Sequence, residues 1–260
     1  MLIMATWNDR RFYVLLSWVM IGLIHGQTQA SSGVRSAFTD KVLALSRSSS
    51  TLDVVDSRGK DQALKLRAFE VVKGSLYLGL EQQQVITAPL SAVAAVLDNV
   101  DQYVELFEGF ASVRRVKESE TQWVLAWEQT IPIFFLPNEK YETYYFVDQP
   151  TPLRKVYRYQ LKQQDGRIRF NDGLIVLEAL DSQRTLYTEV DYVDADWGPL
   201  KVLGDSRIWK ESVEGLALSD FAIRLKSEHL DWSYSKVRSE ARSLLKLSPV
   251  DRVVEERTRL

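Results

Sequence analysis

Cysteine is absent from the 260-residue chain, and histidine occurs only twice. Without cysteine the protein can form no disulfide, thiolate metal site, Cys-His nucleophile or lipid-modified N-terminal cysteine. His25 lies in an apolar N-terminal stretch, so the rest of the chain has only His229 and no multi-histidine metal site. Glycine-rich phosphate loops and the Gly-x-Ser-x-Gly elbow of serine hydrolases are also missing. We therefore expect neither a metal nor a cofactor, and the sequence offers little support for catalysis.

Neither sign of charge dominates. The chain has 33 Lys and Arg against 35 Asp and Glu, a net charge of −2. Basic residues do not cluster beyond the pair Arg114-Arg115, so the chain offers no patch for a nucleic acid and we expect none as partner. With 45% hydrophobic and 26% charged residues, the composition is that of a globular protein large enough to bury a core.

No apolar run reaches the roughly twenty residues that a membrane-spanning helix needs. The run Phe12 to Ile24 has about thirteen, follows Arg10 and Arg11, and precedes small residues that end at Ala30. This pattern predicts a signal peptide cleaved after Ala30, and hence a periplasmic or secreted protein that begins at Ser31. An uncleaved anchor and a misassigned start are the alternatives.

The composition divides the chain into four parts. The signal peptide (1–30) is followed by a polar N-terminal extension (31–73), a main domain (74–230) and a helical tail (231–260). Two strands are predicted near the boundary between extension and main domain, at Leu64–Lys73 and at Leu76–Ile86. Glu81-Gln-Gln-Gln84 in the second strand predicts that one of its faces is solvated.

Two short helices and a series of strands come next. Pro89 and Ser91 are typical of a helix start, with Ser91 as a candidate cap, and a second short helix ends before Gly109. After Gly109 the apolar residues recur with a period of two. This pattern predicts strands at 113–116, 123–133, 141–147, 153–161, 168–180 and 186–195. Their short, turn-rich connections require antiparallel neighbours.

The last long segment is helical. From Asp205 to about Leu230 an apolar stripe that includes Val213 and Phe221 recurs at helical spacing, and the segment contains no proline. Asp231 is the candidate cap of a second helical piece. The order is therefore strand, two short helices, antiparallel strands and a long helix, which predicts a curved sheet packed on that helix.

Several segments of the chain resemble the START-like (SRPBCC) superfamily, which includes Bet v 1-like allergens, lipid-transfer domains, polyketide cyclases and coenzyme Q-binding proteins. The resemblance is carried by Thr87–Leu97, Asp98–Tyr103, Tyr187–Tyr192 and Trp197–Leu200. It implies an α+β helix-grip fold, in which a curved antiparallel sheet wraps around a long C-terminal helix and two short helices follow the first strand. It also implies a cavity between sheet and helix for a lipid or another hydrophobic small molecule.

Aromatic residues on the predicted strands and helix are the candidate ligand contacts. The candidates are Trp127, Tyr145, Tyr157, Tyr159, Tyr192 and Trp209, together with Gly215. Alternating aromatic residues are also common in a plain core, but buried phenols need hydrogen-bond partners and so favour a pocket with some polar groups. A glycine inside a helix costs about 1 kcal/mol relative to alanine, so Gly215 indicates that the helix leaves room there for a ligand or a strand.

The connection Ile131–Pro137 is apolar throughout. If it is exposed, Phe134, Phe135 and Leu136 form a tip that makes transient membrane contact or covers the cavity mouth. The alternative is that this segment folds back into the core.

Binding of a lipid or other hydrophobic molecule, with transport as an extension of it, is thus the leading hypothesis for function. A polyketide cyclase or dehydratase that uses tyrosines and a carboxylate is the enzyme alternative. A protein-interaction scaffold with a filled cavity is the third. Glu189 and Asp191 share a strand face, which the sequence alone predicts to be solvated.

Overall fold

A computed structural model of the chain describes residues 65–70, 78–119, 121–130, 138–164, 168–195 and 205–247, with only the backbone at some positions. The strands are β1 (Lys65–Glu70), β2 (Leu78–Ile86), β3 (Phe110–Glu118), β4 (Gln122–Gln129), β5 (Glu139–Thr151), β6 (Arg154–Gln164), β7 (Ile168–Ala179) and β8 (Thr185–Ala195). The helices are α2 (Leu90–Asp98), the 3-10 turn η2 (Val100–Gln102), α3 (Tyr103–Leu106), α4 (Asp205–Glu228) and α5 (Tyr234–Leu245).

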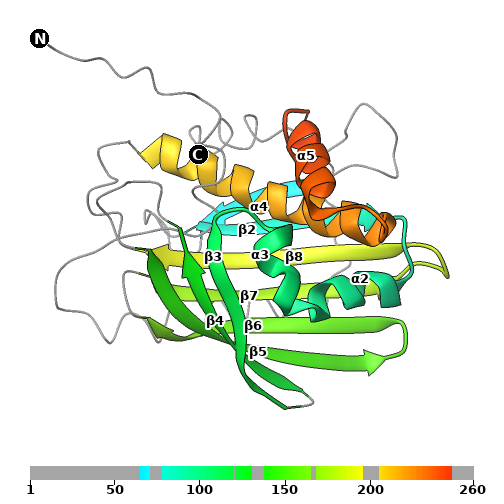
Figure 1. The fold of residues 1–260 in the computed structure, drawn as a ribbon, viewed down its shortest axis with the longest axis horizontal. Helices are drawn as coiled ribbons and strands as arrows, with labels where there is room; N and C mark the ends of the chain where they lie inside the picture. Colours follow the sequence, from blue (N-terminus) through cyan, green and yellow to red (C-terminus); the bar gives the residue numbers. More distant parts are fainter. Residues whose placement is uncertain are drawn as a thin grey trace, which may run out of the picture.

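All eight strands form one antiparallel sheet in the order β1-β2-β8-β7-β6-β5-β4-β3 (Figure 1). Strands β3 to β8 follow one another as a meander, as the short connections predict. The last of them then pairs with β2, which precedes the short helices in the chain. The predicted element order and the antiparallel pairing are therefore confirmed.

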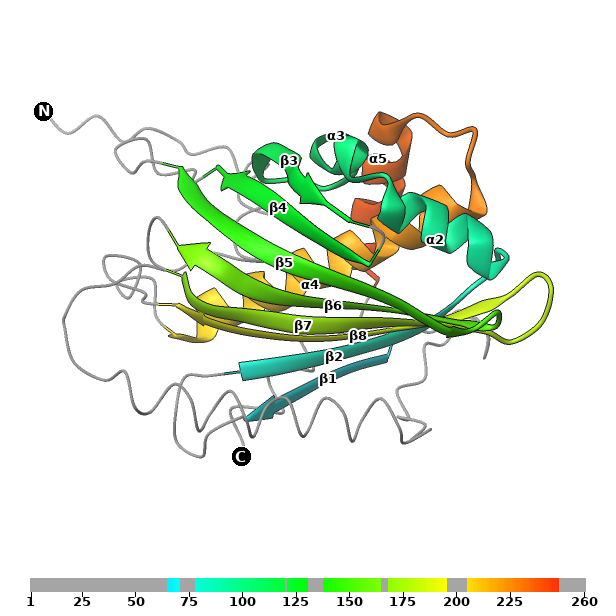
Figure 2. The ribbon, with the colours of Figure 1, turned by 90° about the horizontal axis from the view of Figure 1, so that it is seen from below.

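The sheet is curved, and α4 crosses its concave side (Figure 2). Register shifts interrupt β3 at two places, and β5 carries shifts at Glu142/Thr143 and Asp148/Thr151. Such bulges bend a strand and increase its twist. Helices α2, α3 and α5 pack on α4, so that helix is enclosed between the sheet and a second helical layer. This is the predicted α+β helix-grip fold.

Helix α4 is buried on more than the predicted apolar stripe. Val213 and Phe221 of the stripe are buried, as expected, but so are Asp220 and Arg224. Arg224 lies off the apolar stripe and is buried because α2 and α5 cover the side of α4 that the sheet leaves open. Arg224 is neutralised there by Glu228, whose Oε1 lies 3.2 Å from Arg224 Nε and also accepts the Thr87 backbone N–H at 2.8 Å.

Two predicted helix caps are wrong. Ser91 lies inside the first turn of α2, which starts after Pro89 without a side-chain cap, since the fixed φ of proline already suits a helix start. Helix α5 is capped by Ser233, whose side chain accepts the Lys236 N–H, and not by Asp231. Asp231 lies in the turn between α4 and α5.

The predicted solvated face of β2 is also wrong. Glu81, Gln82 and Gln84 are all buried. β2 is an inner strand between β1 and β8, and α4 covers one of its faces, where Gln84 Nε2 donates to the Asp220 carbonyl at 2.9 Å. Polar residues on a strand therefore mark a solvent-exposed face only when no other element packs on that face. The sequence of one strand does not show whether it is covered.

No helix in the described ranges combines the length and apolar character needed to cross a bilayer. The predicted signal peptide and its cleavage after Ala30 lie outside the described residues, as does nearly all of the predicted extension 31–73.

Candidate functional site: a cavity between the sheet and helix α4

A cavity opens between the concave side of the sheet and α4. It offers about 70 Å³ to water-sized molecules, which is room for several waters. Its walls come from the short helices, the strands and α4. The lining residues are Leu97, Tyr103, Phe107, Phe110, Trp127, Tyr141, Thr143, Tyr145, Tyr159, Asn171, Ile175, Glu189, Leu216, Ser219 and Ile223. The wall is mostly apolar and aromatic, and its few polar groups come from β5, β6, β7, β8 and α4.

Stacked rings form one wall of the cavity. The rings of Trp127 and Tyr141 stack with centroids 6.0 Å apart, and those of Tyr145 and Tyr159 stack at 5.3 Å. The cross-strand pairs Trp127↔Tyr141 and Tyr145↔Tyr159 place these rings side by side on one face of the sheet. The Trp127 indole N–H donates to Thr143 Oγ1 at 2.7 Å, so its only donor is already used.

The polar end of the cavity is built on β8. Tyr187, Glu189 and Asp191 alternate along β8 and are all buried. The Tyr159 hydroxyl lies 2.8 Å from Asp191 Oδ1 and 3.2 Å from Glu189 Oε1. The Tyr187 hydroxyl donates to Glu189 Oε2 at 2.7 Å. Two phenols thus donate hydrogen bonds to two buried carboxylates.

Gly173 makes this arrangement possible. It lies in β7 between its cross-strand partners Tyr159 of β6 and Asp191 of β8. The Tyr159 ring crosses directly over Gly173, and a β-carbon at that position would lie 2.1 Å from Tyr159 Cζ. Only a residue without a side chain allows the phenol to reach across β7 to the carboxylates on the next strand.

The carboxylates continue onto α4. Asp220 is fully buried, and its pKa is raised well above the usual value by burial first and then by the negative charge of nearby Glu189. Neither oxygen of Asp220 receives a well-aligned hydrogen bond from a described donor. A protonated Asp220 explains this environment, because its own O–H can donate to the Glu189 carboxylate.

The phenols of the cavity stay neutral. Burial raises the pKa of Tyr145, Tyr159 and Tyr187 well above the usual value, and neighbouring carboxylates raise it further. These hydroxyls therefore remain hydrogen-bond donors near neutral pH and do not act as bases.

Amide groups complete the polar end. Asn171, 3% exposed, lines the cavity, and its Oδ1 has no hydrogen-bond partner among the described residues. Gln82, the cross-strand partner of Glu189, is fully buried with both amide atoms equally unpartnered. Unpaired buried polar atoms cost free energy and often mark a place where a ligand or water binds. Within the described ranges, no group of acidic or histidine side chains is arranged to hold a metal ion.

Three of the predicted ligand contacts meet in this cavity: Trp127, Tyr145 and Tyr159 all line it. Tyr157 does not line the cavity, although it is buried in β6 two residues before Tyr159. Its hydroxyl turns away to α2, where it lies 2.9 Å from Asp98 Oδ1, so it joins the sheet to the helices. The side chains of Tyr192 and Trp209 and the predicted tip Phe134, Phe135 and Leu136 lie outside the described part of the chain.

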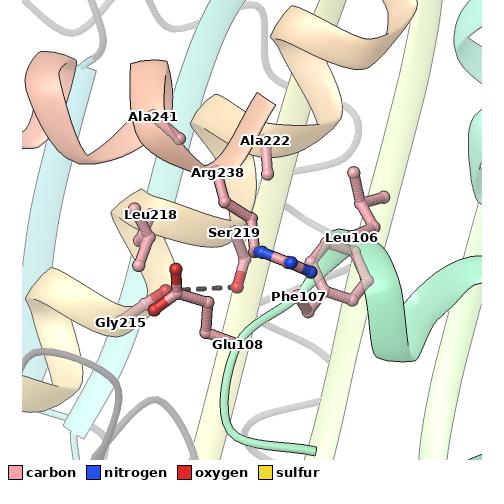
Figure 3. A pocket seen from close by; sticks show the side chains of 9 residues that line it. All are labelled: Leu106, Phe107, Glu108, Gly215, Leu218, Ser219, Ala222, Arg238 and Ala241. Atoms are coloured by element: carbon pink, nitrogen blue, oxygen red, sulfur yellow. Dashed lines mark hydrogen bonds between the residues drawn. The ribbon is translucent and has the colours of Figure 1, made fainter. Parts of the chain in front are cut away.

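Gly215 does not open the main cavity. It lines a separate small gap beside the main cavity, together with Leu106 and Phe107 from the α3 segment and Arg238 and Ala241 of α5 (Figure 3). Gly215 is therefore not among the described residues that line the main cavity. The room it leaves on α4 faces the second helical layer, because α3 and α5 approach α4 there.

The sequence prediction missed the polar end of the cavity. Glu189 and Asp191 were expected on a solvated face but are 6% and 4% exposed. Val190, on the opposite face of the same strand, is apolar and buried too, so β8 is covered on both faces. The alternation of polar and apolar residues along the strand does not reveal this. Asn171 and Asp220 carried no signal in the sequence.

No protein-family model matches the chain, and no curated protein does. Among solved structures, a STAR-related lipid transfer protein from Xanthomonas axonopodis aligns with TM-score 0.50 and 13% identity over 66% of this chain and 96% of its own. A protein from Thermus thermophilus aligns with TM-score 0.50 and 10% identity. The alignment covers 59% of this chain and 99% of the Thermus chain. At such identities the likeness concerns the fold alone. This chain has the helix-grip fold of the START-like superfamily.

Proposed function

We propose that this protein binds a lipid or another hydrophobic small molecule in the cavity between the sheet and α4. The observation that carries the proposal is a buried aromatic cavity with a polar end whose Asn171 oxygen lacks a partner among the described residues. Apolar walls with a few convergent polar groups are typical of small-molecule sites. The similar Xanthomonas axonopodis structure is that of a STAR-related lipid transfer protein, which supports the same class of ligand.

The described cavity is narrow, so a long-chain ligand must widen it. Phe107 and Phe110 line it on either side of Gly109, whose φ of 87° is a backbone conformation that glycine adopts most easily. Displacement of this turn would enlarge the cavity and open only the end of the β3–β4 ladder, where the Thr130 N–H donates to the Gly109 carbonyl and Phe110 pairs with Gln129. Binding is favoured over catalysis because burial keeps the phenols protonated, and the hydroxyls of Tyr103 and Tyr159 already donate to protein acceptors.

Ile223→Phe is expected to block the cavity. Ile223 lines it from α4, so the larger ring occupies ligand space, and uptake of the neutral probe N-phenyl-1-naphthylamine should fall at least about tenfold. The measurement is a fluorescence titration of folded protein, checked by circular dichroism. Leu225→Phe is the matched control, because Leu225 is buried on the same helix but does not line the cavity. Equal uptake by parent and both variants would place the ligand elsewhere, and no uptake by the parent would reject the proposal for this class of probe.

We propose further that the protein is exported. The support is the sequence pattern around Arg10, Arg11 and Ala30. Expressed in a bacterial host, the protein should be recovered from the periplasm or medium with Ser31 as its first residue, as read by intact-mass spectrometry. Recovery from the cytosol with Met1 or its neighbour at the N-terminus would contradict export.

A further inference from the structure

The chemistry of the polar end restricts the ligand that the proposed cavity accepts. Glu189 lines the cavity and accepts the hydrogen of the Tyr187 hydroxyl on Oε2. Its Oε1 lies 3.2 Å from the Tyr159 hydroxyl, which is closer to Asp191 Oδ1 at 2.8 Å. An ionised carboxylate has about four acceptor positions. Glu189 therefore keeps acceptor capacity toward the cavity, where the unpartnered Oδ1 of Asn171 is a second acceptor.

Four hydrogen-bond donors at the same place are already used by protein acceptors. The hydroxyls of Tyr159 and Tyr187 are used by the carboxylates, and the Trp127 N–H is used by Thr143. The Ser219 hydroxyl donates to the Gly215 carbonyl at 3.1 Å. These four groups thus give their hydrogens to other protein groups, and none of them donates to the Oδ1 of Asn171.

The charges around the cavity also favour a ligand that donates hydrogen bonds. Among the described residues that line the cavity, none is lysine, arginine or histidine. Glu189 forms no ion pair with a basic side chain in the described part of the chain, and Asp191 and Asp220 lie behind it. A buried carboxylate without a cation is costly, and a cationic ligand group would offset that cost. The stacked faces of Trp127, Tyr141 and Tyr145 also favour a cation over an anion, because the face of an aromatic ring is electronegative.

We infer that the ligand is an amphiphile whose polar end donates hydrogen bonds and carries positive charge, that is, an aliphatic or aromatic amine, with Glu189 and Asn171 as its acceptors. The inference rests on the proposed function and names the ligand class for that same cavity. It predicts that a free carboxylic acid of the same chain length is rejected, because its carboxylate would meet Glu189 without an intervening donor.

The test is a matched set of twelve-carbon ligands, dodecylamine, dodecanol and dodecanoate, titrated into the purified chain by isothermal calorimetry near pH 7.5 and below their micelle concentrations. We expect dodecylamine to bind at least about tenfold more tightly than dodecanoate, with dodecanol between them. Glu189→Gln keeps acceptor and donor groups at the site but removes the charge, so it should lower dodecylamine affinity about tenfold and change dodecanol affinity little.

Two further variants separate the site from general charge effects. Glu178→Gln removes one negative charge from β7 at a residue that pairs with Arg154 and does not line the cavity, so the ligand order should not change. Asn171→Leu removes the second acceptor and should weaken both dodecylamine and dodecanol. This variant also decides the matter if Glu189→Gln does not fold.

Equal affinity for the three ligands, or tightest binding of dodecanoate, would overturn the amine inference and leave the proposed function standing. A preference for dodecylamine that Glu189→Gln and Asn171→Leu both leave intact would also overturn it, since the amine would then be bound elsewhere. If none of the three ligands binds to the folded parent, the proposed function fails together with the inference.

Discussion

Replacing Gly173 with alanine is expected to unfold the polar end of the cavity, at a cost of about 3 kcal/mol in the free energy of unfolding. The new β-carbon would lie 2.1 Å from Cζ and 2.2 Å from the hydroxyl of Tyr159, so the ring must leave its place. Overpacking of this kind costs roughly 1–3 kcal/mol. Displacing the hydroxyl also removes a donor from the buried Asp191 and Glu189, which adds roughly 1–3 kcal/mol.

A double-mutant cycle measured by urea unfolding tests the cause. Tyr159→Ala removes the ring, and in that background Gly173→Ala should cost less than about 1 kcal/mol, giving a large coupling energy between the two positions. Alanine also restricts the unfolded chain and suits a strand better than glycine, so without the clash a small gain is expected. If Gly173→Ala alone is neutral, or if the two changes are additive, the close approach of ring and glycine does not control this site.

Asp220→Asn is expected to raise the free energy of unfolding by at least about 1 kcal/mol near pH 8. The pKa of Asp220 is raised in the folded protein, first by burial and then by Glu189. Between the unfolded and folded pKa values the native state binds more protons, so stability falls as pH rises through this window. One unit of pKa shift corresponds to about 1.4 kcal/mol, and asparagine removes the titration while keeping a donor for Glu189.

The stabilisation by Asp220→Asn should depend on pH. The difference between variant and parent should shrink toward pH 4, where Asp220 is protonated in the folded chain and close to half protonated in the unfolded chain. Urea unfolding at pH 4, 6 and 8 measures it, with Asp101→Asn as control, because Asp101 is exposed and should show no such trend. A variant that is less stable than the parent at pH 8 would show that the carboxylate is ionised and held by the fold.

Most of the secondary structure follows from the sequence. Period-two patterns and short turns locate β4 to β8, and helical spacing from Asp205 onward locates α4, because each of these patterns depends on neighbours only a few residues apart. Trp127, Tyr145 and Tyr159 were found for the same reason: alternation along a strand shows which residues share a face. The resemblance to the START-like superfamily then implied a cavity between the sheet and the long helix.

Alternation does not say what covers each face, and there the sequence prediction failed. Glu81, Gln82, Glu189 and Asp191 were expected in solvent, yet β8 lies inside an eight-stranded sheet and α4 closes its concave side. The same limit applies to Gly215, whose helix position was evident but whose neighbours α3 and α5 were not.

The sequence by itself therefore determined the strands, the helices, their antiparallel order and the aromatic wall, because local periodicity encodes them. Only the tertiary structure decided that Tyr159 crosses Gly173 to meet carboxylates from β8, and that Asp220 of α4 lies beside them. These groups are up to about sixty residues apart in the chain. Their meeting depends on sheet register and helix packing, and no local pattern carries either.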